Sequence, residues 1–182
     1  MNGAPLTKHQ GAPLRLLVPG WYGVGNVKWL TDIHAQEIPY IGKYQARWYK
    51  TLKQVTIGNE VKWTEVPVTR MQLKSFLARV TKEGSRHKVL VVTLNDGTPL
   101  KSVEVKVDDG PWQPATADAA TKDKFSWKYF NYIWENATPG EHTLVSRVTD
   151  VNGQVQPTAA DLARKKTFLE NNSQFPRKVR IS

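Results

Sequence analysis

The chain has 182 residues, of which 40% are hydrophobic and 23% charged, a composition typical of a globular protein. It contains no cysteine, which excludes disulfides, thiolate metal sites and a cysteine nucleophile within this chain. Its apolar runs are too short to cross a bilayer, so no membrane association is expected. The net charge of +10 is spread along the chain and favours anionic ligands. No zinc-finger, homeodomain or RNA-recognition pattern accompanies it, so nucleic acid is not expected as a partner, and salt-sensitive polyanion binding is the weakest alternative.

Residues 1–65 are dominated by residues that interrupt regular structure. Proline and glycine recur throughout this stretch, and such punctuation breaks both helices and strands. Two short apolar pieces remain, Leu14–Val18 and Val27–Ile33. Four of the seven tryptophans also fall here: Trp21, Trp29, Trp48 and Trp63. Because large aromatic side chains in irregular backbone need something to pack against, we expect a further body of protein to cover this stretch.

From about Val66 onward the pattern changes to short strands separated by turns. The alternation is clearest at Lys101–Val107, where Val103, Val105 and Val107 share one face. The first expected strand lies near Leu73–Val80, where the spacing of apolar residues also fits a helix. The other expected strands are His87–Leu94, an alternating stretch from Phe125 to Asn131, His142–Val148 and Lys178–Ile181. Turns are expected at Asp109-Gly110, where the pair supplies positive φ, and at Pro139-Gly140 and Asn152-Gly153. Such spacing favours an all-β sandwich over residues 66–182, with a boundary between residues 64 and 70.

No pair or triad of side chains has catalytic spacing in the sequence alone. The four histidines (His9, His34, His87 and His142) lie far apart and form no metal-binding motif, so structural or surface roles and no metal ligands are expected. No P-loop is present. Gly20-x-x-Gly23-x-Gly25 is a weak dinucleotide fingerprint, because it does not lie between a strand and a helix.

One glycine-rich stretch is more suggestive of ligand binding. Arg15 and Lys28 flank a loop that contains Pro19-Gly20-Trp21-Tyr22-Gly23. Glycines let backbone N–H groups approach a ligand closely, while Arg offers a bidentate fork for phosphate and Lys a point charge. The pattern indicates a phosphate- or anion-binding loop. The alternative is a tight connection that carries ordinary surface cations.

Several short motifs resemble one known family. The run Gly11-Ala-Pro-Leu-Arg-Leu-Leu-Val-Pro-Gly-Trp-Tyr-Gly23, followed by Asn26-Val-Lys-Trp-Leu30, resembles the last segment of the molybdopterin-binding domain of the sulfite oxidase family. The downstream half resembles that family's dimerisation domain, which is immunoglobulin-like. Its markers are Val103-Glu104-Val105, Asp109-Gly110-x-Trp112, Pro139-Gly140-Glu141-His142 and Arg147-x-x-Asp150-x-x-Gly153-x-x-Gln156-Pro157. The resemblance implies a mostly β fold, an immunoglobulin-like β-sandwich (66–182) preceded by a loop-rich fragment of an α+β molybdopterin-binding domain (1–65).

The resemblance also implies roles for individual residues. Arg15 matches the family arginine that contacts the phosphate side of the pterin cofactor. Asn26, Val27 and Lys28 match the segment that hydrogen-bonds the pterin. Tyr49 lies where the family has its active-site tyrosine beside the molybdenum. Tyr44 is the less favoured substitute, and a plain core or surface tyrosine is the other reading.

Two positions depart from the family pattern. Where the family has a histidine before the glycine of its H-G-x-P-[LV]-R motif, this chain has Gln10, with His9 one place earlier. Either Gln10 or His9 would then face the cofactor. A family arginine that helps to bind sulfite matches Leu169, although Arg164, Arg177 and Lys165-Lys166 lie near in sequence. This leaves the substrate open, as sulfite or another small molecule.

The absence of cysteine also bears on catalysis. In the family a cysteine thiolate holds the molybdenum and lies upstream in the same domain, so this chain is expected to be inactive alone. The resemblance implies an upstream molybdopterin domain, a homodimer through the sandwich, a cytochrome or other electron acceptor, and a periplasmic location. The alternative is a non-catalytic immunoglobulin-like module that dimerises or binds another protein.

Overall fold

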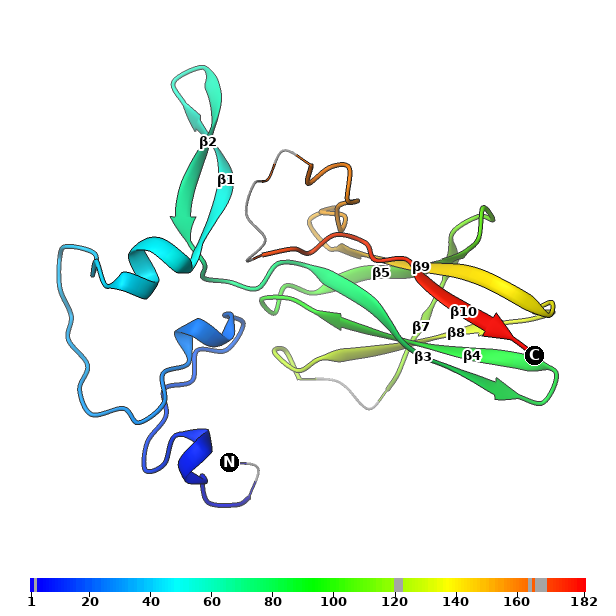
Figure 1. Ribbon diagram of the computed structural model, residues 1–182, viewed down its shortest axis with the longest axis horizontal. Helices are drawn as coiled ribbons and strands as arrows, with labels where there is room; N and C mark the ends of the chain where they lie inside the picture. The colour runs from blue at the N-terminus through cyan, green and yellow to red at the C-terminus, as the bar shows by residue number, and fades with distance from the viewer. Residues whose placement is uncertain (2, 120–122, 164, 166–169) are drawn as a thin grey trace. The chain divides into compact units, whose positions relative to one another are not determined.

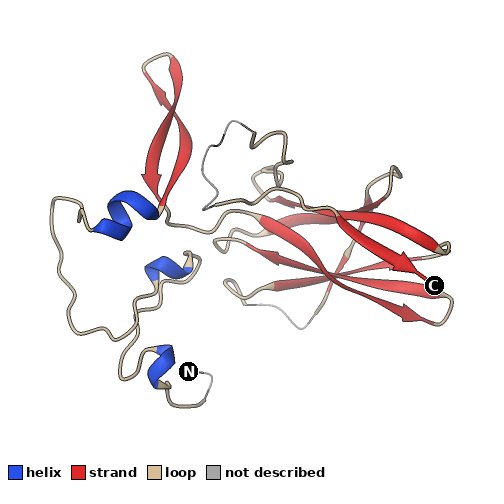
Figure 2. Cartoon of the chain, in the orientation of Figure 1, coloured by secondary structure: helices blue, strands red, loops and turns tan. Residues whose placement is uncertain are grey.

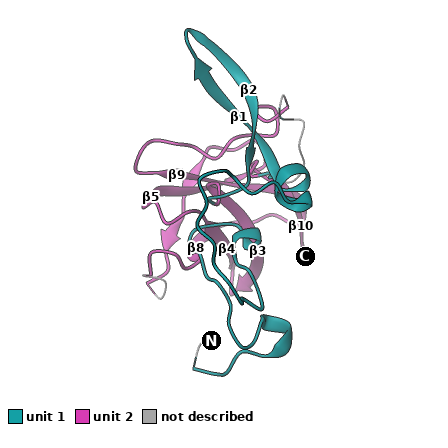
Figure 3. Ribbon diagram, turned by 90° about the vertical axis from the view of Figure 1, so that its left-hand side faces the viewer, with its two compact units in different colours: residues 1–70, 165–171 teal, residues 71–164, 172–182 magenta. Residues whose placement is uncertain are grey.

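The computed structural model describes residues 1–182 except residues 2, 120–122, 164 and 166–169 (Figure 1). Antiparallel strands supply most of the regular structure, and the described helices are single turns (Figure 2). This confirms the predicted mostly β fold. The chain divides into two compact units, Met1–Arg70 with Lys165–Asn171, and Met71–Arg164 with Asn172–Ser182 (Figure 3). Among the described residues, no helix is long and apolar enough to span a membrane.

The first unit combines short helical turns with one hairpin. The turns are η1 (Lys8–Gln10), η2 (Gly23–Gly25) and the π-helix η3 (Tyr44–Trp48). Strands β1 (Lys50–Ile57) and β2 (Glu60–Pro67) pair antiparallel around a turn in which Gly58 has φ 62°. The hairpin was not predicted from the sequence. Leu52, Val55 and Ile57 do not keep a strict alternation, so the period-2 signal of a strand is interrupted.

The second unit is a sandwich of two four-stranded antiparallel sheets. One sheet has the order β3-β4-β8-β7 and the other β10-β9-β5-β6. The strands are β3 (Lys74–Glu83), β4 (Arg86–Leu94), β5 (Leu100–Val107), β6 (Gln113–Pro114), β7 (Thr116–Ala117), β8 (Lys128–Trp134), β9 (Gly140–Asp150) and β10 (Arg177–Ile181). Alternate residues of both sheets form the core, which contains Leu73, Leu77, Val89, Val91, Val103, Val105, Trp134, Leu144, Val148 and Ile181.

The strands expected from sequence are found, with two differences in detail. The strand expected from Phe125 begins only at Lys128, because Ser126 turns back and its N–H donates to the carbonyl of Asp123 at 3.2 Å. In the turn after β5, positive φ falls on Asp108 (φ 50°) rather than on the Asp109-Gly110 pair. Aspartate tolerates this region better than most residues. The Asp108 carboxylate also accepts the Thr143 N–H at 2.7 Å.

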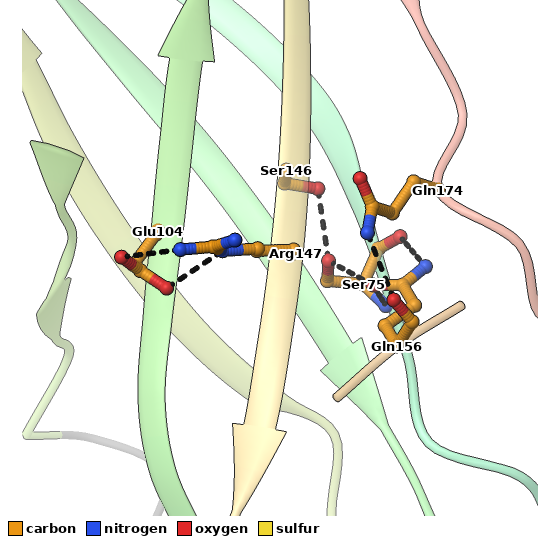
Figure 4. Close-up of polar contacts among 6 residues, drawn as sticks. All are labelled: Ser75, Glu104, Ser146, Arg147, Gln156 and Gln174. Atoms are coloured by element: carbon orange, nitrogen blue, oxygen red, sulfur yellow. Dashed lines mark hydrogen bonds and ion pairs between the residues drawn. The ribbon is translucent and has the colours of Figure 1, made fainter. Parts of the chain in front are cut away.

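The outer edge of β3 is closed in part by a side-chain amide (Figure 4). Gln156 accepts the Ser75 N–H at 3.0 Å and donates to the Ser75 carbonyl at 3.2 Å, as a neighbouring strand would. The same amide donates to the Ser173 carbonyl at 3.2 Å. The Gln156 side chain is fully buried, so these groups have no access to water as a substitute partner. The Ser75 hydroxyl is also bonded to that of Ser146 in β9, which links the two sheets.

The residues just before Gln156 shape the turn that delivers it. The Asp150 carboxylate accepts the N–H groups of Asn152 and Gln154, both at 2.9 Å. Gly153 has φ 82°, which a side chain would strain. The Arg147-x-x-Asp150-x-x-Gly153-x-x-Gln156 motif therefore forms a turn and supplies the amide that pairs with the edge of β3, here called the edge clamp.

Arg147, the first residue of that motif, is fixed on the outer face of its sheet. It donates to both Glu104 carboxylate oxygens, at 2.8 and 3.1 Å (Figure 4). Its guanidinium also lies 4.3 Å from the ring centroid of Trp112. Three residues of the family motifs therefore contact one another: Glu104 on β5, Arg147 on β9 and Trp112 just before β6.

His142 links the turn after β5 to the start of β9. Its Nδ1 lies 2.7 Å from the Asp108 carboxylate and its Nε2 lies 2.8 Å from the Thr138 carbonyl. These two hydrogen bonds raise the pKa of His142 above its usual 6.5. The bonds from His142 and the Thr143 N–H lower the pKa of Asp108 below its usual 3.8.

Replacing Gln156 with Ala should lower the free energy of unfolding by about 2–4 kcal/mol, because two buried backbone groups of Ser75 lose their partner. Chemical denaturation would measure the change. Gln154→Ala, at an exposed position two residues away, is the matched control and should cost little. Equal stability of the two variants would show that the Gln156 amide does not hold the edge.

The His142–Asp108 pair should make the stability of the protein fall at both high and low pH. The stabilisation from His142 is full below pH 6.5 and is lost as pH rises through its raised pKa; that from Asp108 is full above pH 3.8 and is lost as pH falls through its lowered pKa. Melting temperatures of His142→Gln should therefore fall less between pH 6 and 9 than those of the unsubstituted chain. His34→Gln, at an exposed position, should keep the original profile.

Candidate cofactor-binding loop

Two short segments of the first unit pair and bring the predicted cations together. The Leu16 N–H donates to the Val27 carbonyl at 2.9 Å, and the Leu30 N–H donates to the Leu14 carbonyl at 3.0 Å. Arg15 and Lys28 form an antiparallel bridge between these bonds. The two apolar pieces noted in the sequence therefore close a loop with both cations at its neck.

The bridged pair Arg15 and Lys28, here called the neck of the loop, is hydrogen-bonded to helix η1 through Lys28 and Trp29. Lys28 Nζ donates to the His9 carbonyl at 2.8 Å, and the Trp29 indole N–H donates to the Lys8 carbonyl at 3.0 Å. Gly11 ends η1 with φ 104°, and a Cβ there would lie 2.8 Å from the Lys28 Cβ. Only glycine allows this approach without displacing the lysine backbone.

The Arg15 side chain has unused hydrogen-bonding capacity. One terminal nitrogen donates to the Gln10 carbonyl at 3.3 Å, whereas the buried Nε has no partner among the described residues. No acidic side chain of the described residues forms an ion pair with Arg15 or Lys28. Unpaired buried donors are rare in folded proteins, so the arginine is a candidate for binding an anion.

Gln10 and Asn26 are engaged by the loop itself. Gln10 and Thr7 form a capping box, in which the Gln10 side chain accepts the Thr7 N–H at 3.1 Å and the Thr7 hydroxyl accepts the Gln10 N–H at 3.3 Å. Asn26 accepts the Val18 N–H at 2.8 Å and donates to the Tyr22 carbonyl. Gln10 and Val27 are exposed, and the choice between Gln10 and His9 as the residue that faces a cofactor stays a prediction.

Tyr49 is linked to this loop through the segment after β2, where the Thr69 carbonyl accepts the Tyr22 N–H at 2.9 Å. It follows η3, where its N–H donates to the Tyr44 carbonyl at 2.9 Å and its carbonyl accepts the Val68 N–H at 2.9 Å. Its side chain is half-buried, and no contact recorded for the described residues joins it to the Arg15–Lys28 neck. Its role beside a metal stays a prediction.

The expected substrate-binding region near residue 169 falls largely outside the described residues, which include neither Leu169 nor Arg164. Lys165 is described and pairs with Glu170 at 2.9 Å, where both side chains are buried. Arg177 opens strand β10 in the second unit. The described residues contain no group of histidine and carboxylate side chains that could hold a metal ion.

Sequence reasoning missed Thr7 and Trp29. Thr7-Lys8-His9-Gln10 has the spacing of a capping box, so its helical turn was open to prediction. Trp29 was noted as an aromatic side chain in need of cover and as part of the Asn26–Leu30 motif, but with no partner of its own. Its bond to the Lys8 carbonyl spans 21 residues, and no local pattern indicates such a contact.

Comparisons with known proteins agree with the motifs. A family model described as oxidoreductase molybdopterin binding domain matches residues 1–44. The chain is 26% identical to mitochondrial sulfite oxidase of Homo sapiens over 188 residues, covering 94% of this chain and 34% of the relative. It is 22% identical to sulfite oxidase of Arabidopsis thaliana over 174 residues, covering 86% of this chain and 44% of the relative.

A solved structure shares the fold. The sulfane dehydrogenase SoxCD from Paracoccus pantotrophus matches with a TM-score of 0.78 and 24% identity, covering 98% of this chain and 46% of that chain. The matched sequences are those of one class of proteins, the molybdopterin oxidoreductases. Within that class, the chain is similar to sulfite oxidases along most of its length. The chain spans about a third of the length of the mammalian relatives that it matches.

Gly11→Ala should loosen the neck of the loop, because the new Cβ would meet Lys28 and φ 104° is unfavourable for alanine by about 1–2 kcal/mol. Hydrogen exchange of the Leu16 and Leu30 amides would measure the opening. Gly23→Ala is the matched control, since a Cβ there meets nothing within 4 Å. Unchanged protection in Gly11→Ala would mean that the neck does not depend on this close approach.

Proposed function

We propose that this chain is the C-terminal portion of a sulfite oxidase-like molybdenum oxidoreductase. In this proposal residues 1–65 supply one edge of the molybdopterin site, and residues 66–182 form an immunoglobulin-like dimerisation domain. The family-model match to residues 1–44 and the coverage of only 34% of the human relative support it. The missing edges of the site, with the thiolate ligand of the metal, would then belong to a separate or upstream molybdopterin domain.

The observation that carries the proposal is the Arg15 Nε, which has no hydrogen-bond partner among the described residues. A buried Nε without an acceptor, 13 positions from a lysine that the fold brings alongside, suits the phosphate of a pterin cofactor. Arg15 would bind that phosphate, and Lys28 would add a second positive charge. The molybdenum cofactor, when bound, would supply oxygen-atom and electron transfer, which no side chain of this chain can perform.

The other predicted site residues would orient the cofactor and the substrate. Asn26 shapes the loop through Val18 and Tyr22, so its contribution to pterin binding would come through the backbone near Val27 and Lys28. Tyr49, with its hydroxyl, would donate a hydrogen bond to an oxygen of a small anionic substrate. Gln10 or His9 would contact the cofactor from η1.

Exposed apolar side chains of the first unit support a missing partner. Ile33, Ile38 and Ile41 are 75%, 75% and 79% exposed, and Tyr40 is 72% exposed. Contiguous apolar segments of this kind mark surfaces that another protein body covers. We propose that the molybdopterin domain covers them. The further partners would be a second copy of the sandwich and a cytochrome or other electron acceptor, in a periplasmic setting.

A second function is favoured by the closed core of the sandwich. The second unit buries a continuous set of residues from both sheets without help from the first. A non-catalytic module that dimerises or binds another protein would need no more than this unit. Sedimentation of the full chain as a monomer at high concentration would count against dimerisation in either proposal.

Co-expression with the molybdopterin domain of a sulfite oxidase tests the cofactor proposal. The purified pair should contain molybdenum and pterin, and Arg15→Ala should reduce both by roughly tenfold or more, the effect of losing a charge-assisted hydrogen bond. Metal analysis and fluorescence of the oxidised pterin measure the two contents.

Arg47→Ala is the matched control, because Arg47 is an exposed arginine of the same unit on η3. It should retain the cofactor. Equal retention by Arg15→Ala and Arg47→Ala would mean that Arg15 has a structural role, and a pair free of molybdenum and pterin would refute the proposed site.

A further inference from the structure

Two sheet edges border a groove in the second unit. Strands β3 and β10 each end their sheet in the strand order. A groove of about 230 Å³ lies between them and is lined by Leu77, Ala78, Arg79, Val80, Arg177, Lys178 and Val179. Four of these lining residues are apolar and three are cationic.

The chain itself covers one half of the β3 edge and leaves the other half open. Gln156 pairs with Ser75, and Asn172 donates to the Leu73 carbonyl at 3.1 Å. From Leu77 to Glu83, no described backbone group other than those of β4 pairs with β3. An open strand edge is a template for another strand, and the amide of Gln156 already occupies the neighbouring half in that manner.

The charges at the groove decide which strand could add there. Arg79 and Arg177 are exposed and have no ion-pair partner among the described residues, whereas Lys178 pairs with Glu141 at 2.8 Å. Cations on a sheet edge repel a second copy of the same edge, and the whole chain carries a net charge of +10. A carboxylate-bearing strand would instead offer each guanidinium a bidentate partner.

We propose that this groove binds an extended acidic segment of a partner protein, which adds as a strand to the open half of β3. The main chain of the segment would pair with residues from Leu77 to Glu83, a length of about 23 Å. Its carboxylates would face Arg79 and Arg177, and its apolar side chains would face Val80 and Val179. This proposal does not depend on the molybdopterin site.

Binding of a defined peptide to the full chain tests the proposal. The probe is a fluorescein-labelled peptide of about nine alternating valine and glutamate residues, enough to span the open edge. Fluorescence anisotropy should show saturable binding, while an alternating valine–lysine peptide should not bind. The double variant Arg79→Glu/Arg177→Glu should weaken binding by roughly tenfold or more.

Arg47→Glu/Lys101→Glu is the matched control, since it changes the net charge equally at exposed residues that do not line the groove. It should leave the affinity nearly unchanged, and circular dichroism would verify that both double variants fold. Equal weakening in the two double variants would overturn the proposal, because net charge alone would then explain binding. Equal binding of a peptide with alternate N-methylated amides would also overturn it, as would no binding at all or self-association of the chain through this edge.

Discussion

The pairing of the Gln156 amide with the backbone of Ser75 is the interaction on which the second unit depends most. It satisfies a donor and an acceptor of an edge strand inside the protein, where neither could reach water. The same amide holds the Ser173 carbonyl, so one side chain joins the segment after β9 and the segment before β10 to β3. The hydroxyls of Ser75 and Ser146 extend this polar contact between the layers. A sandwich whose layers otherwise meet through valine and leucine, which pack in many ways, thereby acquires a directional link.

The Gln156 amide also divides the β3 edge into two parts, one hydrogen-bonded to the same chain and one lined by cations. One part is closed by neutral amides from the same chain, which need a fixed geometry to replace a strand. The other carries Arg79 and faces Arg177, whose charges protect the open backbone from like-charged edges. Both hydrogen bonding and charge keep the edge strand from pairing with the edge of another molecule. Only protection by charge leaves the backbone open to a partner of opposite charge.

Much of the second unit could be predicted because its signals are local. Alternation in Lys101–Val107 and the valine-rich His87–Leu94 reflect one buried face each, so the strands follow from neighbouring residues. Gln156 was recognisable only as part of a family motif, since its partner Ser75 lies 81 residues away. In the first unit the flanking cations were predicted, yet their alignment as bridge partners depends on backbone pairing between Leu14 and Leu30. The β1–β2 hairpin escaped prediction because its apolar residues do not alternate strictly, and its register is set by the turn at Gly58.

The loop around Arg15 and Lys28 illustrates how a small irregular segment can hold a charged pair without a hydrophobic core. The two cations lie side by side although their mutual repulsion opposes it, and no described carboxylate offsets that repulsion. The bonds from Lys28 and Trp29 to the carbonyls of η1, together with the close approach at Gly11, keep the pair in place. Ordering the cations in this way before an anion arrives lowers the entropy that binding must overcome. A multiply charged group such as a phosphate would then relieve the repulsion and satisfy the free Arg15 nitrogen in a single step, which a monovalent surface ion could do only in part.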